Sequence, residues 1–594
     1  MDCFIIAAGG TGAICARAFV YLAAAGYTNK EKVDTNTYHI LLMDKDKRSD
    51  AVTACENLLS DYNALREQMG AVDGSRTFPK IKIHNWNFTS EIVDEYEKQS
   101  GFPGANLNTL TLEKLLNPNL DPTIDRILST MYTKEERNTD LEKGFYGHPN
   151  IGAPVFDYVK QRFQAQQVVM ANGSTKDNTF MQDLHNALSA GKAYVYLMGS
   201  LFGGTGATVI PNLVLALREL KDDKGNEYGK TNLVLGGSMI MPYFKLPTCP
   251  VDSLETKARV TPVDAKFEGQ TRDALAYYHE SGLLDNMMNL LLLGSSKLDV
   301  TSEIFARGGV QSQHFHLVNL LSAVAAKRFF ADELGSMRNA TNVPNGTPVI
   351  PAKELLVWKA SPDDKGVNPS LTADELGIAE EFNTLNSFLR FSVVVGYYMR
   401  LRFESDPQGM RRWNEIEGTC KQFALEPKKL TKEDVEEKYK NNVKKAGAIC
   451  KGFLQFLYDV SLTGYDWSGY HAKEKVLDNN TGLFAYSVTD RVETGAAAAF
   501  GNRWVDFANL QHLKDLVEAT SISGVLDNLS MKNLCSFEPM GGQAQVTGGG
   551  TDTHIATVYN EALAELGLER NLFGKLRRDD VHFCQIYDKI NGKV

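Results

Sequence analysis

Several features that would assign the chain to a specialised class are scarce in the sequence. Eight cysteines are spread over 594 residues, and their spacing offers neither paired metal ligands nor a dense disulfide framework. These cysteines are Cys3, Cys15, Cys55, Cys249, Cys420, Cys450, Cys535 and Cys584. Their pattern is typical of a reducing cytosol, so we expect a cytoplasmic location.

Long hydrophobic runs are also missing. No uninterrupted apolar stretch approaches the roughly 20 residues that span a bilayer. The first ten residues, MDCFIIAAGG, have no basic leading segment and reach glycines after a short apolar piece, which predicts a strand and not a signal peptide. The sequence has no long-period repeat and no low-complexity tract. We therefore expect a soluble protein without a membrane span.

Basic residues are not in excess. The formal net charge is −10 and the pI is about 5.7, so we expect no nucleic-acid partner, although local basic patches are compatible with this balance. Hydrophobic residues make up 43% of the chain, enough for a sizeable core. Because the length exceeds what one core normally organises, the composition predicts a globular chain of two or three domains.

A glycine-rich turn lies within residues 193–220. Residues 194–198 have the content of a buried strand, and an apolar helical period resumes at Val209, with Pro211 expected in the first helical turn. Between them lie Gly199, Gly203, Gly204, Thr205 and Gly206. Glycines let several backbone N–H groups approach one anion, and the positive end of the following helix favours negative charge there. The turn predicts a phosphate site; the alternative is a tight strand-to-helix turn without a ligand.

The turn has no Walker lysine, so any phosphate must be held mainly by backbone N–H groups. A second turn, Gly9 to Gly12, follows an apolar strand at residues 3–8 and precedes a helix. In it Gly10 and Gly12 fit the spacing of the dinucleotide fingerprint around Thr11, but Cys15 occupies the third glycine position. This turn is compatible with a phosphate site, with NAD, or with a close helix–sheet contact.

Polar residues follow the other predicted strands. Asp44 and Asp46 end the second strand, where they can bond a ribose, approach Mg²⁺ or start the next helix. Gly147, His148 and Asn150 belong to a loop that opens a later helix, and His148 can reach a phosphate, although a lone loop histidine is also typical of a surface. Alternating strands and helices predict an α/β parallel sheet of Rossmann-like type, in which these loops converge on one crevice.

At residues 203–206, GGTG, the sequence resembles the tubulin and FtsZ family, whose signature is such a run between a strand and a helix. Phe202 and Thr208 replace the small residues that bracket the run in the family. The family has an Asn-x-Asp step beside the nucleotide, of which this chain keeps Asp46. Its loop for the terminal phosphate contains Asn-Pro, which stands here in reversed order at residues 149–150.

The resemblance implies a fold and a function. It implies a tubulin/FtsZ-like nucleotide-binding domain over residues 1–310 with an insertion at about 87–143, a central helix at 311–335, and a divergent α+β region at 336–594. It also implies binding of GTP with Mg²⁺, ATP not being excluded, together with hydrolysis and head-to-tail assembly into cytoskeletal-type filaments.

The apolar segment at residues 313–330 predicts a helix buried between two domains. On it Phe315 and Asn319 are i and i+4 neighbours, so a ring and an amide share one face and can stack on and recognise a base. The resemblance places them near the family's base-contacting positions. The alternative is that Phe315 belongs to the core and Asn319 is a buried, hydrogen-bonded amide.

The C-terminal half leaves the function open. In the family an acidic residue of the next subunit completes hydrolysis, and the candidates here, Asp332, Asp363 and Asp364, lack the family's Asn-x-Asp setting. A basic cluster can meet an acidic protein partner or form a solvated helix end, at Arg400, Arg402, Arg411 and Arg412. The alternatives to a filament-forming GTPase are a nucleotide-gated regulator that does not polymerise and an NAD-dependent oxidoreductase.

Overall fold

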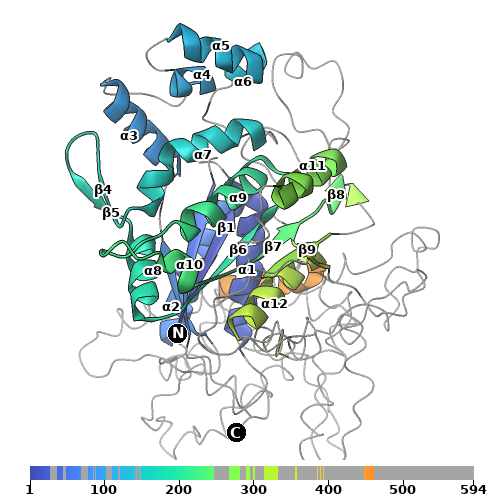
Figure 1. The fold of residues 1–594 in the computed structure, drawn as a ribbon. Coiled ribbons are helices and arrows are strands. Elements are labelled where there is room, and N and C mark those ends of the chain that lie inside the picture. Colours follow the sequence, from blue (N-terminus) through green and yellow to red (C-terminus); the bar gives the residue numbers. More distant parts are fainter. Residues whose placement is uncertain are drawn as a thin grey trace, which may run out of the picture.

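In the computed structural model the described residues form an α/β fold (Figure 1). They comprise most of residues 1–331, residues 355–357, five positions between 381 and 392, and residues 447–460. Within the first 331 residues the structure leaves out 27–35, 45–48, 69–77, 85, 87, 102–109, 118–120, 139–140, 142–144, 146–148, 246–266, 281–288, 295–298 and 301–313.

The main sheet has seven strands within the described part of the chain, and every pairing in it is parallel. The strands are β1 (Asp2–Ala8), β2 (Thr37–Met43), β3 (Lys80–His84), β6 (Ala193–Ser200), β7 (Leu233–Ile240), β9 (Asn289–Leu293) and β11 (Leu355–Val357). Their spatial order is β11-β9-β7-β6-β1-β2-β3, so the direction in which the chain adds strands reverses between β1 and β6. This order is that of a Rossmann-like sheet with one further edge strand.

The central strands form because their residues are apolar on both faces. In β1 every residue after Asp2 is buried, and all eight residues of β7 are buried. Near-continuous apolar runs are typical of parallel strands that helices cover on both sides. The predicted parallel α/β sheet is confirmed, with strand ends within a few residues of those expected from the sequence. Two short pairs lie outside the main sheet: β4 (Gln167–Val169) with β5 (Thr175–Asp177), and β8 (Phe244–Lys245) with β10 (Asp299–Val300).

Helices cover both faces of the sheet (Figure 1). One face carries α1 (Gly9–Ala25), α2 (Asp50–Gln68) and α12 (Leu317–Phe330); here Tyr38 of β2 contacts rings of both α1 and α12. The other face carries α7 (Pro149–Gln164), α8 (Thr179–Ala190) and α9 (Gly204–Arg218), which share one apolar cluster with Phe4 and Ile6 of β1. The short α10 (Tyr228–Thr231) and α11 (Phe267–Glu280) pack beside α9.

The described residues of the segment predicted as an insertion are mainly helical. It contains α3 (Phe88–Ser100), α4 (Leu112–Leu116), α5 (Pro122–Met131) and α6 (Lys134–Arg137). A buried ion cluster joins α3 to α7, because the Arg162 guanidinium lies 2.7 Å from carboxylate oxygens of Glu91 and Asp94. Lys176 of β5 reaches the other oxygen of Glu91 at 2.8 Å. The insertion is thus fixed to the sheet through α7.

The start of α9 differs from the sequence-based expectation. The helix begins at Gly204, so Pro211 lies inside it and not in its first turn. The glycines are themselves the first turn, because they have no side chains to obstruct the close approach described below. A proline has no N–H, which leaves the carbonyl of Ala207 without its helical donor. The buried Tyr278 hydroxyl of α11 donates to that carbonyl at 3.1 Å.

The same arrangement occurs in α7. Pro154 lies inside this helix and frees the carbonyl of Asn150. The hydroxyl of Tyr132, which follows α5, donates to that carbonyl at 3.1 Å. In both helices an interior proline is therefore tolerated because a tyrosine from a neighbouring element replaces the missing donor.

Two described pieces of the predicted C-terminal region join the first half of the chain. Strand β11 pairs with β9 at one edge of the main sheet. Residues 447–460 form a helix whose Phe453 and Phe456 contact the Tyr21 ring of α1. Both halves of the sequence thus contribute to one core.

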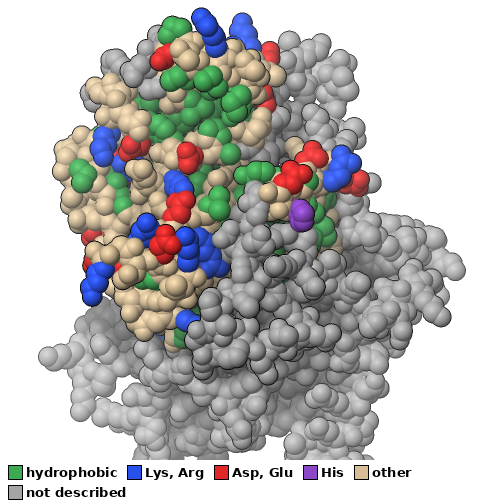
Figure 2. All heavy atoms as spheres, in the orientation of Figure 1, with side chains coloured by type: hydrophobic (Ala, Val, Ile, Leu, Met, Phe, Trp, Pro, Cys, Tyr) green, Lys and Arg blue, Asp and Glu red, His purple; other side chains and the backbone are tan. Residues whose placement is uncertain are grey.

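The described surface is mixed in character (Figure 2). Hydrophobic side chains gather at its upper end, where Figure 1 places α5, and Ile127 and Met131 of this helix are 53% and 64% exposed. None of the described helices is long and apolar enough to cross a membrane.

The Tyr278 hydroxyl provides a test of the proline arrangement. Tyr278→Phe leaves the buried Ala207 carbonyl without a donor, and we expect the free energy of unfolding to fall by about 1–3 kcal/mol. The measurement is urea denaturation followed by circular dichroism. The control is Tyr277→Phe, since the adjacent ring is 52% exposed. Equal midpoints for the two variants contradict the assignment.

Candidate functional site

The candidate site lies outside the carboxyl ends of β1 and β6. These neighbouring strands mark the point where the strand order reverses. Right-handed connections then place the helix after β1 and the helix after β6 on opposite faces of the sheet, so that both helices begin at the same crevice. In open parallel sheets ligands bind at this position.

The first turns of α1 and α9 touch. Gly9 has a φ of +73°, and a Cβ on it would lie 3.4 Å from the backbone nitrogen of Gly206. A Cβ on Gly12 would lie 2.5 Å from the Met198 carbonyl oxygen, and one on Gly206 would lie 2.7 Å from the Ser200 nitrogen. The distances at Gly12 and Gly206 are too short for any side chain, so packing alone requires glycine at these two positions.

Packing does not require every glycine of the turn. Gly199 is explained by packing, because a Cβ there would lie 2.5 Å from the Ile210 side chain. At Gly203, in contrast, an added Cβ would meet only the Ser200 side chain, whose hydroxyl can rotate away. Gly203 and Gly204 are the N-cap and first residue of α9. Their lack of side chains keeps the end of α9 open to a ligand.

Both helix ends are electrostatically suited to an anion. Neither Ala8, the N-cap of α1, nor Gly203 provides a side-chain cap, and neither first turn contains an acidic residue. First-turn N–H groups have no partner within their own helix, and the helix dipole makes this end positive. Gly10 and Thr11 lie in the first turn of α1. Two such ends at one crevice can hold a multiply charged anion.

An acidic residue borders the same crevice. Thr205, in the first turn of α9, donates its hydroxyl to Asp44, which follows β2, at 3.1 Å. This bond joins the ends of β2 and β6 across β1. A carboxylate beside an anion site is a ligand type that Mg²⁺ prefers. Asp46, the second acidic candidate of this loop, lies outside the described residues.

The predicted base-recognition pair is buried, but its two residues do not share a helix face as expected, because α12 begins at Leu317 and Phe315 precedes the N-cap His316. Asn319 is 0% exposed: its oxygen accepts from the His316 N–H at 2.8 Å, and its nitrogen contacts the Cys15 sulfur at 3.4 Å. Phe315 is 2% exposed and packs on Phe456. Both residues belong to the core in this structure, which is the alternative that the sequence left open. Their contact with a base stays a prediction.

Tyr243, which was not among the predicted site residues, connects α12 to the glycine turn of α1. Its side chain hydrogen-bonds to Asn319 and to Thr11. Burial raises the pKa of the Tyr243 hydroxyl, and burial also raises the pKa of the Cys15 thiol to about 11, so both groups stay protonated at neutral pH. The sequence feature that could have identified Tyr243 is its position just after a predicted strand, at the carboxyl edge of the sheet, where ligands bind.

The first turn of α7 also approaches α9. A Cβ on Gly152 would lie 2.7 Å from the Thr208 side chain. Asn150 is exposed, and its amide donates to Glu136 of α6 at 2.9 Å. Gly147 and His148 of the preceding loop lie outside the described residues. So do the proposed hydrolytic residues, Asp332, Asp363 and Asp364.

The buried hydrogen bonds of Asn319 lead us to predict that this residue stabilises the fold. Asn319→Ala removes the partner of the His316 N–H and of the Tyr243 hydroxyl, both buried, so we expect a loss of about 1–3 kcal/mol in the free energy of unfolding. Urea denaturation measures this loss. Asn186→Ala, at an exposed amide of α8, is the control and should leave the midpoint nearly unchanged. Matching midpoints in the two variants rule out a stabilising role for the Asn319 amide.

Comparison of the chain with protein-family models, curated proteins and solved structures finds no match. The fold is therefore identified by its own strand order and the crevice by its own contacts. What these establish is a Rossmann-like α/β fold in which two helix ends without side-chain caps or first-turn acidic residues meet at the reversal between β1 and β6.

Proposed function

We propose that the chain is a tubulin/FtsZ-like protein that binds a purine nucleoside triphosphate, GTP, with Mg²⁺ in the crevice between β1 and β6. The observation that carries the proposal is the meeting of two uncapped, glycine-rich helix ends at the reversal of strand order. Backbone N–H groups of both ends would hold the phosphates, which suits a chain without a Walker lysine. Asp44 would approach the Mg²⁺.

The geometry favours a triphosphate over a dinucleotide. In dinucleotide sites the pyrophosphate lies on the turn after the first strand alone, whose third glycine permits close helix–strand packing. Here Cys15 occupies that third position and faces Asn319 of α12. The second glycine turn, after β6, has no role in dinucleotide binding but adds N–H groups for further phosphate charge.

The base would lie toward the N-terminal end of α12, where Thr11, Tyr243 and Asn319 are joined. For its amide to contact the base, Asn319 must exchange its bond to Cys15 or Tyr243 for one to the ligand. Such an exchange conserves the number of hydrogen bonds, so its net cost is small. In this proposal the base of GTP would take such a bond from Asn319, with Phe315 as a supporting core residue.

Hydrolysis and head-to-tail assembly form the second part of the proposal. They come from the resemblance of residues 203–206 to the tubulin and FtsZ signature. The exposed apolar side chains of α5, Ile127 and Met131, support a contact with another protein surface. A regulator that binds nucleotide without polymerising uses the same crevice, so assembly needs its own test.

Nucleotide binding is tested at Gly204. Gly204→Val puts a branched side chain at the open start of α9, and we expect calorimetric binding of GTP with Mg²⁺ to be lost while circular dichroism stays native. The control is Gly269→Val, in the first turn of α11, where an added Cβ meets nothing within 4 Å. A folded Gly204→Val protein that binds GTP like the wild type overturns the proposal.

Competition in the same assay identifies the ligand class. If the site is specific for guanine, ATP should displace GTP only weakly. If the site accepts triphosphates, NAD⁺ should displace neither GTP nor ATP. Preferential binding of NAD⁺ would support the oxidoreductase instead. If Asn319→Ala leaves the ratio of the GTP and ATP affinities unchanged, the Asn319 amide has only a structural role.

Assembly is tested with full-length protein at tens of micromolar, roughly the range in which weak self-association becomes measurable. We expect light scattering and high-speed pelleting to increase with GTP and not with GDP, because the terminal phosphate completes the filament contact. Gly204→Val should remain in the supernatant with either nucleotide. Wild-type protein that binds GTP but neither scatters nor pellets is a regulator and not a filament former.

A further inference from the structure

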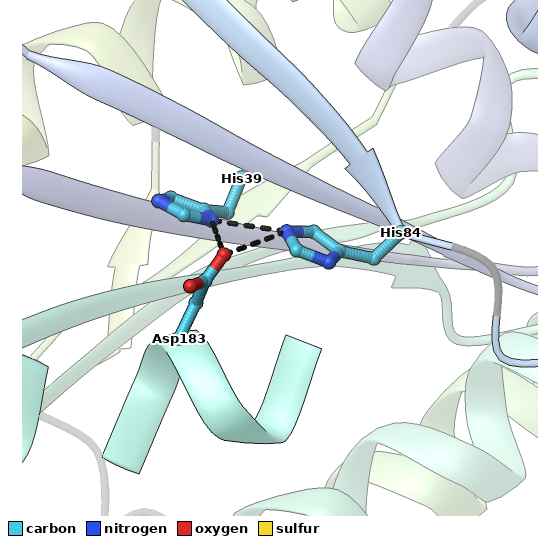
Figure 3. Close-up of side chains that lie close together, drawn as sticks. All are labelled: His39, His84 and Asp183. Atoms are coloured by element: carbon cyan, nitrogen blue, oxygen red, sulfur yellow. Dashed lines mark hydrogen bonds and ion pairs between the residues drawn. The ribbon is translucent and has the colours of Figure 1, made fainter. Parts of the chain in front are cut away.

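A second polar cluster lies on the sheet (Figure 3). His39 of β2 and His84 at the end of β3 are 1% and 4% exposed, and Asp183 of α8 points toward both. Alternation along the paired strands puts the two imidazoles on the same face as α8, because His39 is opposite Lys82 and His84 follows two residues later. The three residues are 45 and 99 positions apart in the sequence.

Three atoms of this cluster converge on one point. His39 Nδ1 lies 3.0 Å from His84 Nε2, and Asp183 Oδ2 lies 3.2 Å from the first atom and 3.7 Å from the second. An ion equidistant from all three is about 1.9 Å from each when it lies in their plane, and reaches the roughly 2.0–2.1 Å of zinc ligand bonds slightly above the plane. The side chains need little movement to coordinate it.

The outer nitrogens of both imidazoles are already oriented. His39 Nε2 lies 2.9 Å from Asp2 Oδ1, and His84 Nδ1 lies 3.0 Å from Thr179 Oγ1. With protons on these outer nitrogens, each imidazole donates to an oxygen and presents a lone pair at its inner nitrogen. Carboxylate and hydroxyl partners of this kind fix the ring orientation of metal-binding histidines.

The surroundings keep the imidazoles neutral, which is the form that binds metals. Burial lowers the pKa of His39, and burial together with the nearby His39 lowers the pKa of His84 to about 4. The Phe4 ring stacks on His39 at a centroid distance of 4.5 Å, and the Phe180 ring lies against both Phe4 and His84. The inner face of the cluster is therefore apolar and rigid.

We propose that His39, His84 and Asp183 form a binding site for a divalent transition-metal ion of the Zn²⁺ class, which fastens α8 to β2 and β3. Two imidazoles and one carboxylate are a ligand set suited to Zn²⁺, and a water completes the tetrahedron. The Asp183 side chain is 30% exposed, which gives the ion an entry path from solvent. The site shares no residue with the crevice between β1 and β6.

Lys82 distinguishes this proposal from a purely structural hydrogen-bond network. Its ammonium group lies 3.1 Å from Asp183 Oδ2, the same oxygen that would bind the ion. The Lys82 side chain is 41% exposed and can move into solvent when an ion enters. Removing its charge should strengthen metal binding because the ammonium group competes with the ion for one oxygen.

The experiment is a calorimetric titration of EDTA-treated, dialysed full-length protein with Zn²⁺, repeated with Co²⁺ for its visible absorption. We expect one tight equivalent and the intense absorption of a tetrahedral Co²⁺ complex. Asp183→Asn should weaken Zn²⁺ binding by more than about tenfold, whereas Lys82→Gln should strengthen it. Asp177→Asn, an exposed carboxylate just before α8, is the matched control and should change nothing.

Thermal melting separates a lost ligand from a lost fold. Zn²⁺ should raise the melting temperature of the wild type and of Asp177→Asn, but not that of Asp183→Asn, because only an intact site adds binding energy to the folded state. Absence of a tight equivalent in the wild type overturns the proposal. So does Asp183→Asn binding Zn²⁺ as tightly as the wild type, or Lys82→Gln binding it more weakly.

Discussion

The close approach of two helix ends at the centre of the sheet is the constraint on which the candidate crevice depends. The strand order reverses between β1 and β6, which forces α1 and α9 to opposite faces and brings their first turns together. Side chains at Gly12 or Gly206 would collide with the backbone of β6. Glycine is required at these two positions by packing. The same packing brings the first-turn N–H groups of both helices close together.

Local patterns in the sequence were sufficient to predict six of the seven described strands of the main sheet, but not the edge strand β11. Apolar runs located β1, β2, β6, β7 and β9, because a parallel strand in the middle of a sheet is buried on both faces, and the shorter β3 was recognised as a strand although lysines alternate with its isoleucines. They also placed two glycine turns at carboxyl ends of neighbouring strands. The start of α9 was misplaced because Pro211 normally marks a first turn, and the hydroxyl that compensates for it belongs to Tyr278, 67 residues later in the chain.

The remaining features depend on contacts between distant residues, and no local pattern contains them. His39 and His84 each occur singly in a strand, and Asp183 is an ordinary helix residue until α8 packs on the sheet. Phe315 likewise lies just before α12, and its burial is completed by Phe456, 141 residues away. Sequence spacing indicates which residues lie on one helix or strand. Only the tertiary fold decides whether such residues face a ligand or the core.

The contacts of α12 connect the crevice to the far end of the described chain. Asn319 is joined through Tyr243 to the glycine turn of α1, and the Phe315 N–H donates to Asp459 of the helix at residues 447–460 at 3.1 Å. Under the proposed function, a base that displaced Tyr243 or Cys15 from Asn319 would alter the first turn of α12, which directly follows the segment that makes the Asp459 contact. Coupling of this kind is reciprocal. Under the same proposal, the contacts that hold residues 447–460 against α12 would therefore also change the affinity for the nucleotide.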